Sequence, residues 1–277
     1  MKDTVIDITR TPFSRYGAYV AVSRDIGEDG QAENALTIYN AYRRFDDCAT
    51  FKLIFGKDEA LVFTASALPQ VLTVENEKGS ARLYIRDDDT VVIDSKGLDL
   101  RLQFLRSRGW GTETGNNTFR LLSESYFFTC TVPVGTAKTE GANKTALTLT
   151  CDGGRILMAL ALRPVEPKEI PLPICPDEEI AAAEREWKAF LAECPLSNST
   201  LAFTHLTWYN LWSCFARAQD VYIHDTVMMS KKFMSSTWSW DHCFNALAIV
   251  LLFHLDRKAG FDRKICKKTK PTGENFR

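Results

Sequence analysis

The residues best suited to chemistry lie in the tetrapeptide Trp238-Ser239-Trp240-Asp241. Flat indole faces suit the C–H faces of a sugar ring, and a fixed carboxylate can accept hydrogen bonds from two neighbouring hydroxyl groups. Trp238, Trp240 and Asp241 therefore fit a sugar-binding site. A structural interpretation competes with this one. Asp241 precedes an apolar helical pattern, where it can accept bonds from the first backbone N–H groups of a helix, and both tryptophans can be core residues.

Other chemistries find little support near this segment. His242 and Cys243 are adjacent, and adjacent helical residues point about 100° apart, so the two cannot easily share one metal ion. The sequence therefore predicts no metal and no cofactor. Lys231 and Lys232 are expected on a solvated face. The sequence contains neither a phosphate-binding glycine loop nor a G-x-S-x-G motif.

Composition restricts the partners. A net charge of −1 favours neither nucleic acid nor an anionic membrane surface. No apolar run is long enough to span a bilayer, and residues 1–17 lack the apolar core of a signal peptide. We therefore expect a cytoplasmic protein, with its eight cysteines as free thiols.

Residues 1–163 have the pattern of an antiparallel β-sandwich domain. Leu98, Leu100, Leu102 and Phe104 alternate with polar residues, which is the period-2 signature of a strand buried on one face. Many short strands with turn residues between them are typical of a sandwich. The predicted strands are 51–56, 60–66, 70–76, 81–87, 90–95, 98–105, 118–122, 126–132, 145–151 and 155–162.

The pattern changes after a proline-rich linker at 164–176, which holds five of the ten prolines. Apolar residues then recur at helical spacing over 177–255, with no strand expected between them. The helices are predicted at 177–191, from about Ser197 or Ser199 to Phe215, and from about His242 to Leu255. Residues 256–277 form an atypical basic tail, with eight Lys or Arg against three Asp or Glu.

Three stretches resemble a known family: "MMSKKFMSSTWSWDHCFNALAI" (228–249), "TWYNLWSCFARA" (207–218) and "TPFSRYGAYVAVS" (11–23). Together they resemble the bacterial branch of glycoside hydrolase family 63. This branch includes the mannosylglycerate-hydrolase-like proteins and is related to trehalases and amylo-α-1,6-glucosidases. The resemblance implies an N-terminal β-sandwich followed by an (α/α)6 toroid, and inverting hydrolysis by two carboxylates. It also implies that Asp241 holds the sugar in the subsite of the cleaved residue, while Trp238 and Trp240 shape that pocket.

The sequence departs from the family in one important respect. The catalytic aspartate and glutamate of the family lie in later toroid helices, which this sequence lacks. We therefore expect only the first helices of an incomplete toroid, from a truncated or frameshifted gene. The expected function is that of a fragment of an inverting α-glycosidase that keeps part of a subsite for an oligosaccharide or glycoside and has no catalytic residue.

Two alternatives remain open. One is a non-catalytic carbohydrate-binding or structural remnant. The other is an all-β interaction domain with an unrelated helical tail. An incomplete toroid would also leave several large apolar side chains uncovered, so we expect self-association through exposed helices. These residues are Trp208, Trp212, Phe215, Phe244, Leu247 and Leu251.

Overall fold

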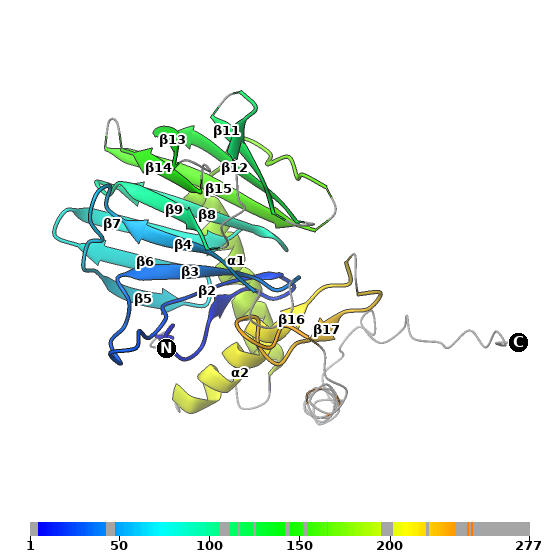
Figure 1. Cartoon of the computed structure of the whole chain (residues 1–277). Helices are drawn as coiled ribbons and strands as arrows, with labels where there is room; N and C mark the ends of the chain where they lie inside the picture. The colour runs from blue at the N-terminus through cyan, green and yellow to red at the C-terminus, as the bar shows by residue number, and fades with distance from the viewer. Residues whose placement is uncertain are drawn as a thin grey trace, which may run out of the picture.

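Two antiparallel sheets make up most of the protein (Figure 1). The computed structural model describes residues 5–42, 48–105, 111–115, 117–123, 126–141, 145–151, 154–164, 166–194, 202–219, 222–236, 243 and 245. Within these residues the sheets contain seven and eight strands, and every strand pair is antiparallel.

The seven-stranded sheet brings the N-terminal strands to one edge. Its order is β1-β2-β3-β4-β9-β14-β13. The bounds are β1 Phe13–Ser14, β2 Val20–Ser23, β3 Ala35–Asn40, β4 Ala49–Phe55, β9 Leu100–Phe104, β14 Ala146–Thr150 and β13 Thr136–Glu140.

The eight-stranded sheet has the order β10-β11-β12-β15-β8-β7-β6-β5. The bounds are β10 Gly111–Glu113, β11 Thr118–Ser123, β12 Tyr126–Val134, β15 Arg155–Arg163, β8 Thr90–Lys96, β7 Gly79–Ile85, β6 Val71–Asn76 and β5 Thr64–Leu68.

The core lies between the two sheets. Phe51 and Phe104 of the seven-stranded sheet meet Phe128 of the eight-stranded sheet, with ring centroids 5.1 Å and 5.9 Å from that of Phe128. In β9, buried Leu100, Leu102 and Phe104 alternate with half-buried residues. The period-2 prediction for this strand is therefore confirmed, and its cause is burial of one strand face only.

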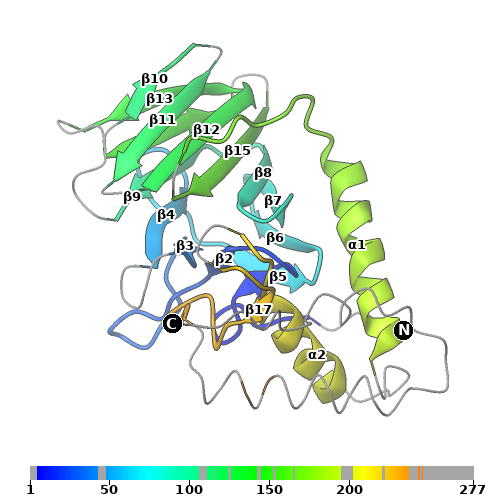
Figure 2. The same ribbon diagram turned by 90° about the vertical axis from the view of Figure 1, so that its right-hand side faces the viewer.

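Helix α1 (Pro176–Glu193) and the chain before it lie against the outer face of the eight-stranded sheet (Figure 2). Ile174 and Ile180 pack with Tyr84 of β7. The Tyr84 hydroxyl donates to Glu179 at 2.8 Å, and Arg15 forms an ion pair with Glu186 at 2.6 Å. Glu179 and Glu186 thus bond α1 to the sandwich and to the loop after β1. The domain boundaries 1–163, 164–176, 177–255 and 256–277 stay a prediction.

The prediction that the helical part is the start of an incomplete (α/α)6 toroid was wrong. The helices whose bounds are described are α1 and α2 (Ala202–Cys214), both beside the sandwich. Cys243 and Asn245 are also helical, and no helical toroid is evident in the described part of the chain. The physical reason lies in the helical stripes. Trp187 of α1 packs against Trp212 of α2, with centroids 5.5 Å apart, and Trp208 packs against Phe190 of α1. These tryptophans belong to the same core cluster as the sandwich residues, so the two helices bury their stripes on each other and within that core.

Two further expectations need correction. Trp208 and Trp212 are only 6% and 3% exposed, so these side chains are not left uncovered. The segment after α2 also forms a small hairpin, β16 (Phe215–Ala216) with β17 (Thr226–Val227), where no strand was expected. Of the helices described, neither is long and apolar enough to cross a membrane.

Candidate functional site

The predicted sugar-binding residues Trp238, Trp240 and Asp241 lie outside the described residues. The structure does describe the chain on both sides of them, up to position 236 and again at Cys243 and Asn245. The candidate site is therefore built from the elements that lead into this segment and from the surfaces beside it.

Lys231 fixes the incoming chain to the N-terminal strands. Lys231 is only 1% exposed. Its amino group donates to Ser14 Oγ at 3.2 Å. It also donates to the Arg15 carbonyl at 3.1 Å and to the Phe215 carbonyl at 2.6 Å. Burial lowers the pKa of Lys231 to about 7, although Cys214 and Asp88 act in the opposite direction.

Lys232 points to a different partner. Its amino group forms an ion pair with Asp25 at 2.7 Å and donates to Ser23 Oγ at 2.9 Å. Asp25 also accepts hydrogen bonds from the hydroxyls of Thr37 at 2.5 Å and Tyr39 at 2.7 Å. Burial alone would raise the pKa of Asp25, but the bonds from Lys232 and the two hydroxyls outweigh it and lower this pKa.

The prediction that both lysines lie on a solvated face was wrong. Lys231 and Lys232 are 1% and 8% exposed. Their partners Ser14 and Ser23 lie 217 and 209 positions away in the sequence, so no local pattern could have indicated the contacts. Ser235 adds a third anchor, with its Oγ 2.9 Å from the buried Sγ of Cys48.

Helix α2 is anchored to the same N-terminal strands. The buried hydroxyl of Tyr209 accepts a hydrogen bond from the Ser14 backbone N–H at 3.0 Å and donates to the Pro12 carbonyl at 3.2 Å. The Tyr16 ring packs against Trp212, with centroids 5.5 Å apart, and against Phe215, with centroids 4.6 Å apart. These contacts fix one side of a cavity.

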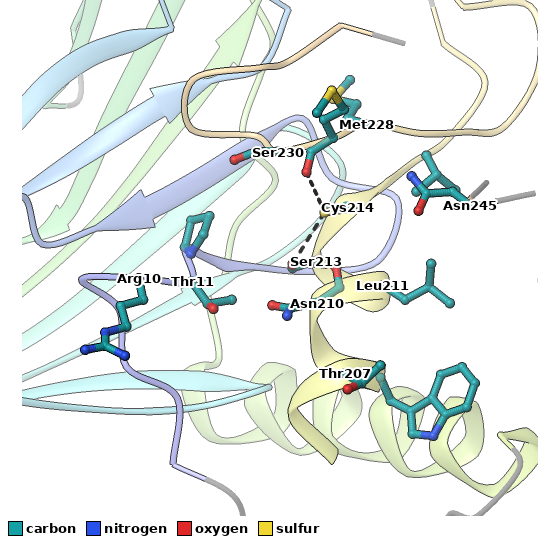
Figure 3. Close-up of a pocket in the computed structure, with 14 residues that line it drawn as sticks. Arg10, Thr11, Thr207, Asn210, Leu211, Ser213, Cys214, Met228, Ser230 and Asn245 are labelled. Atoms are coloured by element: carbon teal, nitrogen blue, oxygen red, sulfur yellow. Dashed lines mark hydrogen bonds between the residues drawn. The ribbon is translucent and has the colours of Figure 1, made fainter. Parts of the chain in front are cut away.

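The cavity has a volume of about 740 Å³ and opens between the N-terminal segment, α2 and the chain after β17 (Figure 3). Arg10 and Thr11 lie on one side and Asn245 on the opposite side. Aromatic, aliphatic and sulfur-containing side chains are mixed with hydroxyl and amide groups. The lining residues are Arg10, Thr11, Pro12, Thr207, Trp208, Asn210, Leu211, Ser213, Cys214, Val227, Met228, Met229, Ser230 and Asn245.

The described wall of this cavity contains no Asp or Glu. The most buried carboxylates lie elsewhere and are paired. Asp94 on β8 accepts from Arg82 and Arg155, each at 2.7 Å. Asp89 pairs with Lys168 at 2.5 Å and with Arg163 at 3.1 Å. The described residues thus offer this cavity hydroxyl and amide contacts but no carboxylic general acid or base.

Metal binding has no visible support in the part of the chain that is described. Its His, Cys, Asp and Glu side chains form no group of three or more that could hold an ion. The thiol of Cys214, which lines the cavity, donates to the Met229 carbonyl at 3.6 Å, and burial raises its pKa. It is therefore a neutral thiol at neutral pH.

The comparisons with known proteins identify no family. No family model matches the sequence, and no curated protein matches it either. Among solved structures, a mutant of a glycoside hydrolase family 81 enzyme from Clostridium thermocellum is similar at a TM-score of 0.40 and 11% identity. The match covers 58% of this chain and 24% of that one, so the chain spans about a quarter of that enzyme's length. This is a weak likeness in fold, and it carries no argument about function.

Proposed function

We propose that the protein binds a glycoside or oligosaccharide, in the lineage of the inverting α-glycosidases of family 63, through Trp238, Trp240 and Asp241. In this proposal the cavity beside α2 accepts the rest of the ligand. Hydrolysis is not part of the proposal. The described wall of the cavity carries no Asp or Glu, and inversion needs two carboxyl groups across one bond.

One observation carries the proposal. The three stretches that resemble the family meet in a single interface, although about 200 positions separate the first from the others. Lys231 bonds to Ser14, and Tyr209 bonds to Ser14 and Pro12. The stretches also provide all three sides of the cavity. Residues that resemble one family motif and converge on one cavity favour a binding role over an all-β interaction domain with an unrelated tail.

Chain geometry supports the link between the cavity and Asp241. Asn245 lines the cavity and follows Asp241 by four positions. In this proposal the Asp241 carboxylate reaches a sugar bound in the cavity. The hydroxyl and amide groups of Ser230 and Asn210 are suitable partners for further sugar hydroxyls.

Ligand-observed NMR tests the proposal. Saturation-transfer difference spectra should show binding of at least one member of a panel of α-glucosides, α-mannosides and mannosylglycerate. Trp238→Ala and Trp240→Ala should abolish the signal, whereas Trp187→Phe, on α1 and outside the cavity lining, should keep it. The same samples, followed for hours, should show no hydrolysis. Absence of binding across the panel would leave the structural-remnant alternative, and turnover by the purified chain would contradict the non-hydrolytic assignment.

A further inference from the structure

Lys231 is a buried amine without a described carboxylate partner. Its three acceptors are the Ser14 hydroxyl oxygen and the carbonyls of Arg15 and Phe215. An ammonium group has three N–H donors, so the geometry satisfies the charged form. Enclosure of a charge among neutral groups nevertheless costs free energy, because these acceptors replace water without supplying an opposite charge.

The neighbouring groups do not depend on Lys231 for their hydrogen bonds. The Arg15 carbonyl also accepts from the Ala18 N–H at 3.1 Å, and the Phe215 carbonyl also accepts from the Gly17 N–H at 3.1 Å. The Ser14 hydroxyl donates to the Val20 carbonyl at 2.8 Å. An apolar side chain of similar length would therefore leave none of these three groups without a partner.

Lys231 lies where three chain segments meet, at residues 14–17, 214–217 and 228–231, which we call the Lys231 junction. Three backbone bonds connect its segments in the described part of the chain: Gly17 N–H donates to the Phe215 carbonyl at 3.1 Å, Arg217 N–H to the Gly17 carbonyl at 3.1 Å, and Met228 N–H to the Cys214 carbonyl at 3.0 Å. The junction joins the sandwich to the chain that leads toward position 237. A change in the free-energy cost of burying the Lys231 amino group therefore changes the stability of this connection.

The charged and titratable groups around the amine come from several elements. Cys214 and Tyr209 belong to α2, and burial raises the pKa of both. Asp88, in the turn between β7 and β8, is paired with Arg217 at 3.1 Å. Arg15, beside the amine, is paired with Glu186. None of these groups provides an unpaired carboxylate that would hold the ammonium form.

We propose that Lys231 is a proton-sensitive latch, which holds the Lys231 junction closed when its amino group is neutral and loosens it when this group gains a proton. The inference does not depend on the proposed glycoside binding. Its expected consequence is that the chain after β17 opens more often in mildly acidic solution than in mildly alkaline solution.

The direction follows from the pKa of Lys231, about 7 in the folded protein against an ordinary 10.5. Below pH 7 the closed junction must bury a charged ammonium group. Above pH 7 the buried amine is neutral, so closing no longer carries this free-energy cost. The closing equilibrium therefore strengthens by up to about tenfold per pH unit above pH 7. Burial raises the pKa of the Cys130, Cys194 and Cys214 thiols above 9.0 in the folded protein. Above pH 9 these thiols therefore favour the open form, which opposes the effect of Lys231. The informative window is therefore pH 7 to 9.

Hydrogen exchange with mass spectrometry tests the latch on the full chain. Peptides covering 214–219 and 226–231 are compared at pH 7, 8 and 9 after division by the intrinsic exchange rate. In the wild type, opening should decrease by up to about tenfold per pH unit. Lys231→Met should remove this dependence. Lys232→Met is the matched control: it should loosen the loop at every pH and keep the dependence, because Lys232 pairs with Asp25.

If Lys231→Met fails to fold, a measurement on the wild type alone tests the latch. Carbon-detected NMR of the lysine side chains gives the titration of Lys231 directly. A midpoint near 7 supports the latch, and a midpoint above 9.5 overturns it. An equal pH dependence of exchange in the wild type and Lys231→Met also overturns it.

Discussion

Removal of one buried hydroxyl should weaken the docking of α2 on the N-terminal strands. Tyr209 is 1% exposed, and its hydroxyl accepts from Ser14 N–H at 3.0 Å while donating to Pro12 at 3.2 Å. Tyr209→Phe keeps the ring in the core and deletes only this oxygen. We expect a clear loss of stability without a change in fold.

The magnitude follows from the group that is left behind. Ser14 is fully buried, so its N–H cannot find water once the hydroxyl is gone. A buried donor without a partner costs about 1–3 kcal/mol. In a protein of this size each 1 kcal/mol lowers Tm by roughly 2–4 °C. The expected effect therefore lies well above the error of a melting experiment.

Urea denaturation followed by tryptophan fluorescence and by circular dichroism measures this loss. Tyr222→Phe is the matched control. The Tyr222 hydroxyl makes only a long hydrogen bond, 3.5 Å, to the Ser235 carbonyl, and the residue is half-buried, so water can replace the lost hydroxyl. That variant should stay within about 0.5 kcal/mol of the wild type. Equal stabilities of Tyr209→Phe and the wild type would refute the docking of α2 on β1.

Further predictions concern the charged groups. Asp94→Asn should cost about 1.5–3 kcal/mol at neutral pH, since charged bonds to Arg155 and Arg82 are lost. Burial would raise the pKa of Asp94, but these two bonds outweigh it and lower it below 3.8, so wild-type stability falls as pH drops below 3.8. Asp94→Asn should therefore show a smaller change in Tm between pH 5 and pH 2.5 than the wild type, and an equal change would contradict the pairing. For Asp25 and Lys232, a double-mutant cycle with Asp25→Asn and Lys232→Met should give a coupling of about 0.5–3 kcal/mol in urea unfolding, and additive effects would rule out the ion pair.

The sequence predicted β9, which is buried on one face, and also β8 and β15, which are buried on both, but it missed β2 and β3. β9 alternates buried and half-buried residues, and it was predicted. All residues of β2 and β3 are buried, so neither strand shows a period of two, and with four and six residues both are shorter than β8 and β15. Both strands are N-terminal and lie beside the segment that contains Lys231 and Lys232.

The sequence predicted the helices whose apolar residues recur regularly. It did not predict what those helices pack against. The expected helices at 177–191 and before Phe215 correspond to α1 and α2. Helical spacing reveals which face is buried but not what covers it, and Trp187, Trp208 and Trp212 proved to lie where α1 and α2 join the core of the sandwich. The toroid came from the family resemblance alone. For the candidate site, contacts across some 200 positions, such as Lys231 with Ser14, leave no trace in a local pattern.

Calorimetric titration of the wild type and Asp241→Asn with the glycoside that gives the strongest NMR signal tests the central claim most directly. Asparagine keeps the size of the side chain and removes the charged acceptor, which is worth about 1.5–3 kcal/mol in a hydrogen bond. The account predicts at least about tenfold weaker binding by Asp241→Asn, with Tm unchanged. Unchanged affinity together with a large fall in Tm would contradict it, and would show that Asp241 caps a helix.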